Sequence, residues 1–268
     1  MMEQELTRLV ETVKRAGARA REMATRGFEV QTKKDRSPVT TADLEVNRIL
    51  LDMQRVHFPE DGWLSEESPD KPDRLEKARV WIVDPIDGTK AYVNRLPEYC
   101  ISVALVEQGK PVVAAIYNPS TDQLFTAIRG QGLSLNGKPV TLRPTEDATS
   151  LVMVSTREFR SGRWAGLGGL VQCRPMFSIA NALALVAAGQ IHATITIEPE
   201  NEWDLAAGVL LIEESGGAVA DAQGQPFRFN QKVPLFHGVI AVSATAGREL
   251  RPLLQAHADR ARTKRTRS

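Results

Sequence analysis

The segment from Trp81 to Thr89 ends an apolar strand in two carboxylates that could hold a metal ion. Asp84 and Asp87 flank Pro85, whose fixed φ and missing N–H group interrupt regular strand pairing. The two carboxylates can therefore converge instead of pointing to opposite faces of a sheet. Two nearby carboxylates repel one another unless a cation lies between them, and ligation by oxygen alone suits Mg²⁺. The pattern indicates a magnesium site.

Gly88 and Thr89 follow these carboxylates and supply groups that would bind an anion. A phosphate that bridges the cation and the backbone N–H groups of Gly88 and Thr89 is the simplest chemistry that uses all of them. The same Asp-Pro-x-Asp-Gly sequence is also good turn chemistry, because Asp, Pro and Gly close turns for steric and hydrogen-bonding reasons. The segment alone leaves a phosphate site and a simple turn open.

Two further acidic segments favour the phosphate site. Glu66 and Glu67 follow the apolar pair Trp63-Leu64, and Asp204 begins an apolar, helix-like run in Asn-Glu-Trp-Asp-Leu-Ala-Ala-Gly. The acid pair, the Asp-Pro-Ile-Asp-Gly-Thr core and the Trp-Asp-x-Ala-Ala-Gly segment, in this order, resemble the inositol monophosphatase superfamily of metal-dependent, lithium-sensitive phosphatases. The resemblance covers nearly the whole chain, from the first helix to about residue 250.

The resemblance implies in-line hydrolysis of a phosphate monoester by two or three Mg²⁺ ions, with inhibition by Li⁺. Asp43 and Thr89 match the pair that orients and deprotonates the attacking water in the family. One departure is Ser65, where the family commonly has Gly. The metal ligands implied by the resemblance are Glu66, Asp84, the backbone carbonyl of Ile86, Asp87 and Asp204.

Asp43 also has a purely structural interpretation. Thr40 and Asp43 have the spacing of a capping box at the start of a helix, and a helix N-terminus stabilises a carboxylate. The residues themselves leave capping and catalysis open, and the resemblance favours catalysis.

The residues beside the central motif bear on the substrate. The sequence Asp-Gly-Thr-Lys-Ala-Tyr at 87–92 and the Glu202-Trp203-Asp204 segment resemble the 3′(2′),5′-bisphosphate nucleotidases of the superfamily. A second phosphate would be a natural partner for Lys90. True inositol monophosphatases usually have Thr in place of Lys90, and a Glu seven residues before the last metal Asp, where this chain has Ile197. The predicted substrate-binding residues are Gly88, Thr89, Lys90 and Glu202.

Other interpretations stay open. Lys90 could be a solvated surface lysine, and Leu96-Pro97 together with the short chain resembles general bacterial inositol monophosphatases. Inositol 1-phosphate is therefore the alternative substrate, followed by histidinol phosphate and fructose 1,6-bisphosphate. A function of another class is a catalytically silent, RNA-associated regulatory protein that uses the basic C-terminus. The set of five acids argues against it, because packing does not require so many carboxylates to converge.

The chain predicts an α+β fold of layered helices and mainly antiparallel sheets, of the sugar-phosphatase type. Residues 6–16 and 44–56 have the apolar spacing of amphipathic helices. Strand-like segments follow from residue 79 to 142, with short turns and a hairpin at Asn136-Gly137, which make neighbouring strands antiparallel. The second half adds strands near 150–155, 192–197, 217–220 and 238–243, helices near 178–189 and 203–215, and a closing helix.

We expect two halves that meet at the active site. Residues 1–145 form an N-terminal α+β half with most metal ligands, and residues 146–258 form a C-terminal half that contributes Asp204. Residues 259–268 form a basic tail, which we expect to be disordered because like charges do not collapse into a core.

Composition agrees with a soluble enzyme and excludes several other classes. A chain of 268 residues, 42% of them hydrophobic, can bury a substantial core, and a net charge of +1 predicts no specific nucleic-acid partner. Cys100 and Cys173 form no disulfide framework, and the four histidines lack zinc spacing. We expect a cytoplasmic location without a membrane partner, because no signal peptide or membrane-spanning run is present. The resemblance implies a possible homodimer.

Overall fold

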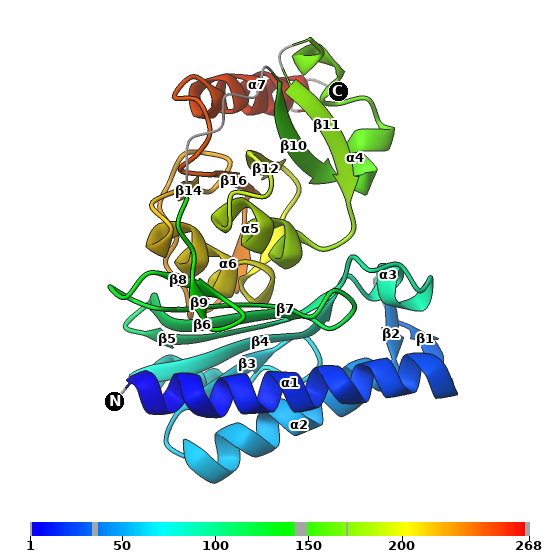
Figure 1. The fold of residues 1–268 in the computed structure, drawn as a ribbon, viewed down its shortest axis with the longest axis vertical. Helices are drawn as coiled ribbons and strands as arrows, with labels where there is room; N and C mark the ends of the chain where they lie inside the picture. Colours follow the sequence, from blue (N-terminus) through cyan, green and yellow to red (C-terminus); the bar gives the residue numbers. More distant parts are fainter. Residues whose placement is uncertain (1, 34–36, 143–148, 170, 266–268) are drawn as a thin grey trace.

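The computed structural model describes residues 2–33, 37–142, 149–169 and 171–265. Layers of helices alternate with two β-sheets, as Figure 1 shows. The helices are α1 (Met2–Arg26), α2 (Thr41–His57), α3 (Thr89–Val93), α4 (Thr156–Arg160), α5 (Ile179–Ala187), α6 (Glu202–Glu214) and α7 (Leu250–Arg265), with 3₁₀-helices η1 (Pro72–Glu76) and η2 (Ala165–Leu167). Among these described residues, no helix has both the length and the apolar character needed to cross a bilayer.

The first sheet is antiparallel except for the parallel pair β3 and β4. Its seven strands lie in sequence order, so short turns join most of them, as the sequence predicts. Asn136 and Gly137 form the expected hairpin with φ values of +51° and +75°. The strands are β3 (Gly62–Ser65), β4 (Arg79–Asp87), β5 (Cys100–Glu107), β6 (Lys110–Asn118), β7 (Gln123–Ile128), β8 (Leu133–Leu135) and β9 (Lys138–Pro139).

The second sheet is mixed and has the order β11-β10-β12-β16-β14. Strand β10 is parallel to both of its neighbours, whereas β16 is antiparallel to both of its own. The layered α+β fold with mainly antiparallel sheets is thus confirmed. The strands are β10 (Ser150–Ser155), β11 (Val171–Met176), β12 (Ala193–Thr196), β14 (Ala218–Ala220) and β16 (Val239–Val242), and two small pairs are formed by β1 (Val30–Thr32) with β2 (Pro38–Thr40) and β13 (Glu200–Asn201) with β15 (Leu235–Phe236).

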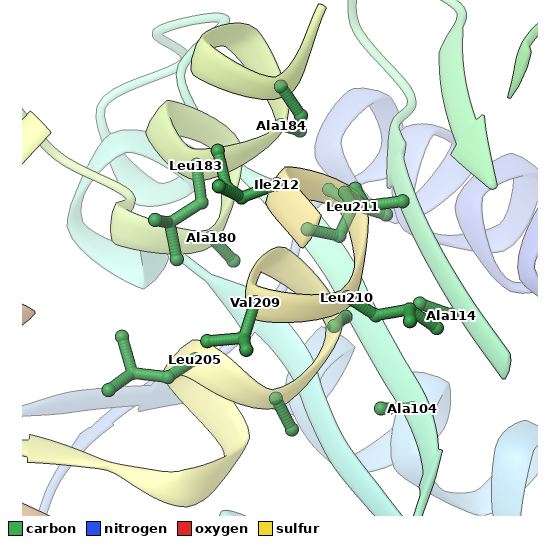
Figure 2. Close-up of a cluster of buried hydrophobic side chains, with 14 of the residues drawn as sticks. Ala104, Ala114, Ala180, Leu183, Ala184, Leu205, Val209, Leu210, Leu211 and Ile212 are labelled. Carbon is green, nitrogen blue, oxygen red and sulfur yellow. The ribbon is translucent and has the colours of Figure 1, made fainter. Parts of the chain in front are cut away.

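Helices α5 and α6 form the middle layer between the two sheets (Figure 1). Helix α6 is apolar on nearly every side, because it packs on the first sheet with one face and on α5 with another. Figure 2 shows Leu210 of α6 beside Ala114 of β6, while Leu183 of α5 faces Ile212. This packing fixes the N-terminal turns of both helices relative to the end of β4.

Helices α1 and α2 cover the opposite face of the first sheet. Leu9 and Val13 of α1 and Leu50 of α2 are fully buried against strand residues such as Trp81, in the helical spacing that the sequence predicts. Cys100 is buried in β5 and Cys173 is half-buried in β11, and both are free thiols.

Strand β4 is irregular where Pro85 interrupts it. Its pairing with β5 shifts register between Asp84 and Asp87, and Asp87 lies opposite Cys100. A bulge of this kind re-aims side chains that would otherwise alternate between the faces of the sheet. The interruption predicted from the proline is confirmed.

The prediction of disorder beyond residue 258 is wrong for most of the basic segment. Helix α7 continues to Arg265, and the Asp259 carboxylate accepts a hydrogen bond from Arg262 at 2.5 Å. Leu254 and Ala258 in the preceding turns are fully buried. Their packing stabilises the helix, which then continues into the basic segment. Residues 266–268, and the proposed boundary between residues 145 and 146, lie outside the described residues.

Gly208 provides a test of the middle layer. A Cβ atom at Gly208 would lie 2.5 Å from two side-chain carbons of Leu183, so Gly208→Ala must push α5 away from α6. Overpacking costs about 1–3 kcal/mol, which outweighs the roughly 1 kcal/mol of helix propensity gained. Urea denaturation should show lower stability for Gly208→Ala and little change for the control Gly247→Ala, where no atom lies within 4 Å. Equal stability of both variants would contradict this packing.

Candidate active site

The first turns of four helices converge at the end of β4. Asp43 lies in the first turn of α2, Thr89 begins α3, Ala180 is in the first turn of α5, and Asp204 is in the first turn of α6. Hydrogen bonds join Thr89 to Asp43 and Ala180 to Asp87. Because helix N-termini carry partial positive charge and unpaired N–H groups, this arrangement favours carboxylates and phosphates.

Three carboxylates gather at the centre of this convergence. One oxygen each from Asp84, Asp87 and Asp204 lies within 4.8 Å of the others. Burial raises the pKa of Asp87 to about 6 despite hydrogen bonds from Ser178 and Ala180. Burial, followed by repulsion from the neighbouring acids, raises the pKa of Asp84 and Asp204 as well. The site therefore holds excess negative charge, which a divalent cation with oxygen ligands would neutralise.

Each of these carboxylates has one oxygen held by the protein. The amide of Ile86 donates to Oδ1 of Asp84 at 3.0 Å, and the amide of Asn201 donates to Oδ2 of Asp204 at 2.7 Å. Oδ2 of Asp87 accepts from the Ser178 hydroxyl and the Ala180 amide, both at 2.6 Å. These bonds fix the orientation of the carboxylates, as a preorganised metal site requires.

Asp43 caps α2 and also contacts Thr89. Its Oδ2 accepts from the amide and the hydroxyl of Thr40 at 2.7 and 2.6 Å, which completes the predicted capping box. Its Oδ1 accepts from the Thr89 hydroxyl at 3.1 Å. The Thr89 hydroxyl also lies 3.1 Å from the carbonyl oxygen of Ile86, and its one proton can serve only one of these acceptors at a time. Capping thus leaves one Asp43 oxygen available to accept the threonine proton.

Glu66 lies at the edge of the cluster and is bound by a lysine that the sequence reasoning missed. Lys33 Nζ lies 2.7 Å from Oε1 of Glu66 and 2.5 Å from Oε1 of Glu67. Burial lowers the pKa of Lys33, but the two glutamates outweigh it and hold the pKa above its ordinary value. Ser65 supports the same loop, because its hydroxyl donates to Asn47 at 2.7 Å. The departure from glycine therefore adds a fixing contact.

Glu202 is not placed with the other predicted site residues. Its carboxylate is fully buried and accepts from the amides of Asn230 and Gln231, so the predicted contact with substrate is not available to it. The reason is helical geometry, because residues two apart on a helix point about 200° away from each other, and Asp204 faces the acid cluster. Burial raises the pKa of Glu202 to about 7.

Lys90 and Gly88 lie at the start of α3. Lys90 is exposed, as a residue that meets a charged substrate from solvent would be. Gly88 has a φ of +90°, and a Cβ atom there would lie 2.8 Å from the carbonyl oxygen of Glu98, so only glycine fits this turn. The backbone can then change direction directly after Asp87.

Three more groups belong to the site and carried no specific signal in the sequence. Ser178 caps α5 and holds Asp87, together with the Ala180 amide. Glu200 lies in β13, and burial together with Asp204 and Asp87 raises its pKa. The apolar run after Ser178 predicts helix α5. The hydrogen bond from Ser178 to Asp87 joins residues 91 positions apart, so the sequence pattern does not reveal it.

Comparison with known proteins identifies the family of the chain. The model of the inositol monophosphatase family matches residues 1–262. The chain is 33% identical to the Nus factor SuhB of Escherichia coli over 207 residues, 73% of this chain and 76% of that protein. It is 32% identical to the 3′(2′),5′-bisphosphate nucleotidase CysQ of Escherichia coli over 215 residues, 78% of this chain and 86% of that protein.

A solved structure shows the same architecture. The inositol monophosphatase of Thermotoga maritima superposes with a TM-score of 0.83 at 25% identity, over 98% of this chain and 99% of that one. The fold and the acidic site thus define a metal-dependent phosphoric monoester hydrolase. The chain belongs to the inositol monophosphatase family.

Paired variants test whether metal binding and activation of water depend on different residues. Asp87→Asn removes a charge from the cluster and should weaken Mg²⁺ binding measured by calorimetry, with a fall in turnover of orders of magnitude. Thr89→Val removes only the hydroxyl that reaches Asp43, so it should lower turnover and leave Mg²⁺ affinity nearly unchanged. Equal losses of Mg²⁺ affinity in the two variants would contradict the division.

Proposed function

We propose that this enzyme removes one phosphate from 3′(2′),5′-bisphosphate nucleotides such as adenosine 3′,5′-bisphosphate. The observation that carries the proposal is the exposed Lys90 at the start of α3, one residue from the Thr89 hydroxyl and three from Asp87. A second phosphate on the substrate gives this ammonium group a partner that a monophosphate lacks. The similarity to CysQ supports the same substrate class.

In this proposal Glu66, Asp84, Asp87, Asp204 and the carbonyl of Ile86 would hold the metal. Bound Mg²⁺ would neutralise phosphoryl oxygens and lower the pKa of a coordinated water. The short distances among Asp84, Asp87 and Asp204 support the three aspartates of this ligand set. We further propose two or three Mg²⁺ ions and inhibition by Li⁺, in keeping with the family.

The protein's own groups would position the nucleophile and the substrate. The Thr89 hydroxyl, 3.1 Å from Asp43, orients the attacking water and passes its proton toward the carboxylate. Burial raises the pKa of Asp43, which makes this carboxylate a better proton acceptor than an exposed one. The amides of Gly88 and Thr89, at the N-terminus of α3, would hold the phosphate in line with the water. The hydrolysis needs no covalent phosphoenzyme.

Lys90→Thr tests the choice of substrate. The change should lower kcat/KM for adenosine 3′,5′-bisphosphate more than for inositol 1-phosphate, because only the former has a second phosphate. A charge-assisted hydrogen bond is worth about 1.5–3 kcal/mol, so the differential loss should be roughly 10-fold to 150-fold, and it should shrink as ionic strength rises.

Lys14 is an exposed lysine of α1 on the outer helix layer, and Lys14→Thr is the matched control. It should leave kcat/KM unchanged for both substrates. Parallel losses on both substrates in Lys90→Thr would make inositol 1-phosphate the leading substrate. Histidinol phosphate and fructose 1,6-bisphosphate complete the panel, and no phosphate release from any of them with Mg²⁺ would overturn the enzymatic proposal.

A further inference from the structure

Glu202 and Arg74 are buried charged residues that hold the same loop from two sides. The two oxygens of Glu202 accept from the amides of Asn230 and Gln231 at 2.7 and 2.8 Å. Arg74 donates to the side-chain oxygen of Asn230 at 2.6 Å and to the carbonyl of Gln231 at 2.9 Å. Nε and Nη2 of Arg74 also donate to the Asp70 carboxylate, at 2.6 and 2.9 Å. The loop at 230–231 is therefore fastened between a carboxylate and a guanidinium.

The two charged side chains at the centre of this network are buried and hydrogen-bonded. Glu202 is 0% exposed and Arg74 is 1% exposed. Asn230 returns a hydrogen bond to the carbonyl of Arg74 at 3.1 Å, and it has a φ of +59°, a conformation that needs support in a residue other than glycine. Buried charged groups without such partners would destabilise the fold, so these hydrogen bonds indicate a fixed geometry.

The loop leads directly to the metal site. After residue 231 the chain enters β15, which pairs with β13, and the amide of Glu202 donates to the carbonyl of Pro234 at 3.0 Å. Asn201 of β13 caps α6 and donates its amide to Asp204 at 2.7 Å. Glu202, the first residue of α6, thus sits between the fastened loop and the turn that carries Asp204.

The other end of the network belongs to the first sheet. Arg74 lies in η1, between β3, which leads to Glu66, and β4, which contains Asp84 and ends at Asp87. Asp204 lies 120 positions after Asp84 in the sequence. The distance between their carboxylates therefore depends on the tertiary contacts between α6 and the first sheet. Helix packing fixes the axis of α6, and the network fixes the direction of its first turn.

We propose that Arg74 and Glu202 are positioning residues for Asp204, and that they set Mg²⁺ affinity without contacting metal or substrate. The inference rests on the proposed ligand role of Asp204. Partners of this kind that orient a metal ligand typically change metal affinity by about 10-fold to 100-fold when replaced.

The test compares Glu202→Gln with Glu158→Gln in the full chain. Both glutamates are 0% exposed and hold backbone amides, since Glu158 accepts from the amide of Ile197 at 3.0 Å and also pairs with Arg163. In each variant the new side-chain N–H group faces a donor, so both should lose thermal stability. Calorimetric titration of the folded, metal-free proteins with Mg²⁺ should show roughly 10-fold to 100-fold weaker binding for Glu202→Gln and less than about threefold change for Glu158→Gln.

Two outcomes would contradict this account, each at a different step. Unchanged Mg²⁺ affinity in Glu202→Gln, with weaker binding in Asp204→Asn, would overturn the positioning role and leave the metal site intact. Unchanged affinity in Asp204→Asn would overturn the ligand assignment itself. If Glu202→Gln does not fold, Arg74→Lys takes its place, because it keeps the charge and loses the forked geometry, and it should weaken Mg²⁺ binding in the same direction.

Discussion

The mutual repulsion of the carboxylates at the end of β4 is the constraint on which the rest of the structure depends. Asp84 and Asp87 are buried, and Asp204 approaches them within 4.8 Å. Like charges removed from water are costly unless a cation or protons balance them. The protein lessens this repulsion with the N–H groups of converging helix N-termini, and it leaves a residual negative charge that suits a divalent cation. A phosphate substrate, which needs that same cation, completes the charge balance.

The layered architecture follows from the need to bring these acids together from distant parts of the chain. The bulge after Pro85 turns two of them toward one point, and the apolar middle layer delivers the start of α5 and of α6 to the same place (Figure 1). Ser178, which caps α5, and Asp204 of α6 are thereby fixed by the apolar packing of Leu183 and Leu210 (Figure 2). A well-packed interior permits only small displacements, which is what a metal site with fixed ligands requires.

The sequence predicted those parts of the fold and site that have a local physical signature. Helices α1 and α2 have clear apolar periods, strands β4 to β9 fall in the predicted run from residue 79 to 142, and the capping box of Thr40 and Asp43 occurs as predicted. The short strands β1, β2, β13 and β15 were not predicted, because they are too short to show a period. Contacts such as that of Lys33 with Glu66 depend on chain segments far apart in sequence, and no spacing rule reveals them. Glu202, predicted to bind substrate, instead binds the amides of Asn230 and Gln231, because a motif gives residue types, whereas the helix period decides which residues face the site.

The metal site can be observed directly. A crystal of this protein grown with Mn²⁺ in place of Mg²⁺ would show the ion by its anomalous scattering, since both ions accept oxygen ligands in similar geometry. We predict an anomalous peak coordinated by Asp84, Asp87 and Asp204, with Glu202 remaining on the amides of Asn230 and Gln231. A peak away from these carboxylates, or none at millimolar Mn²⁺, would contradict the view that their repulsion is balanced by a metal ion.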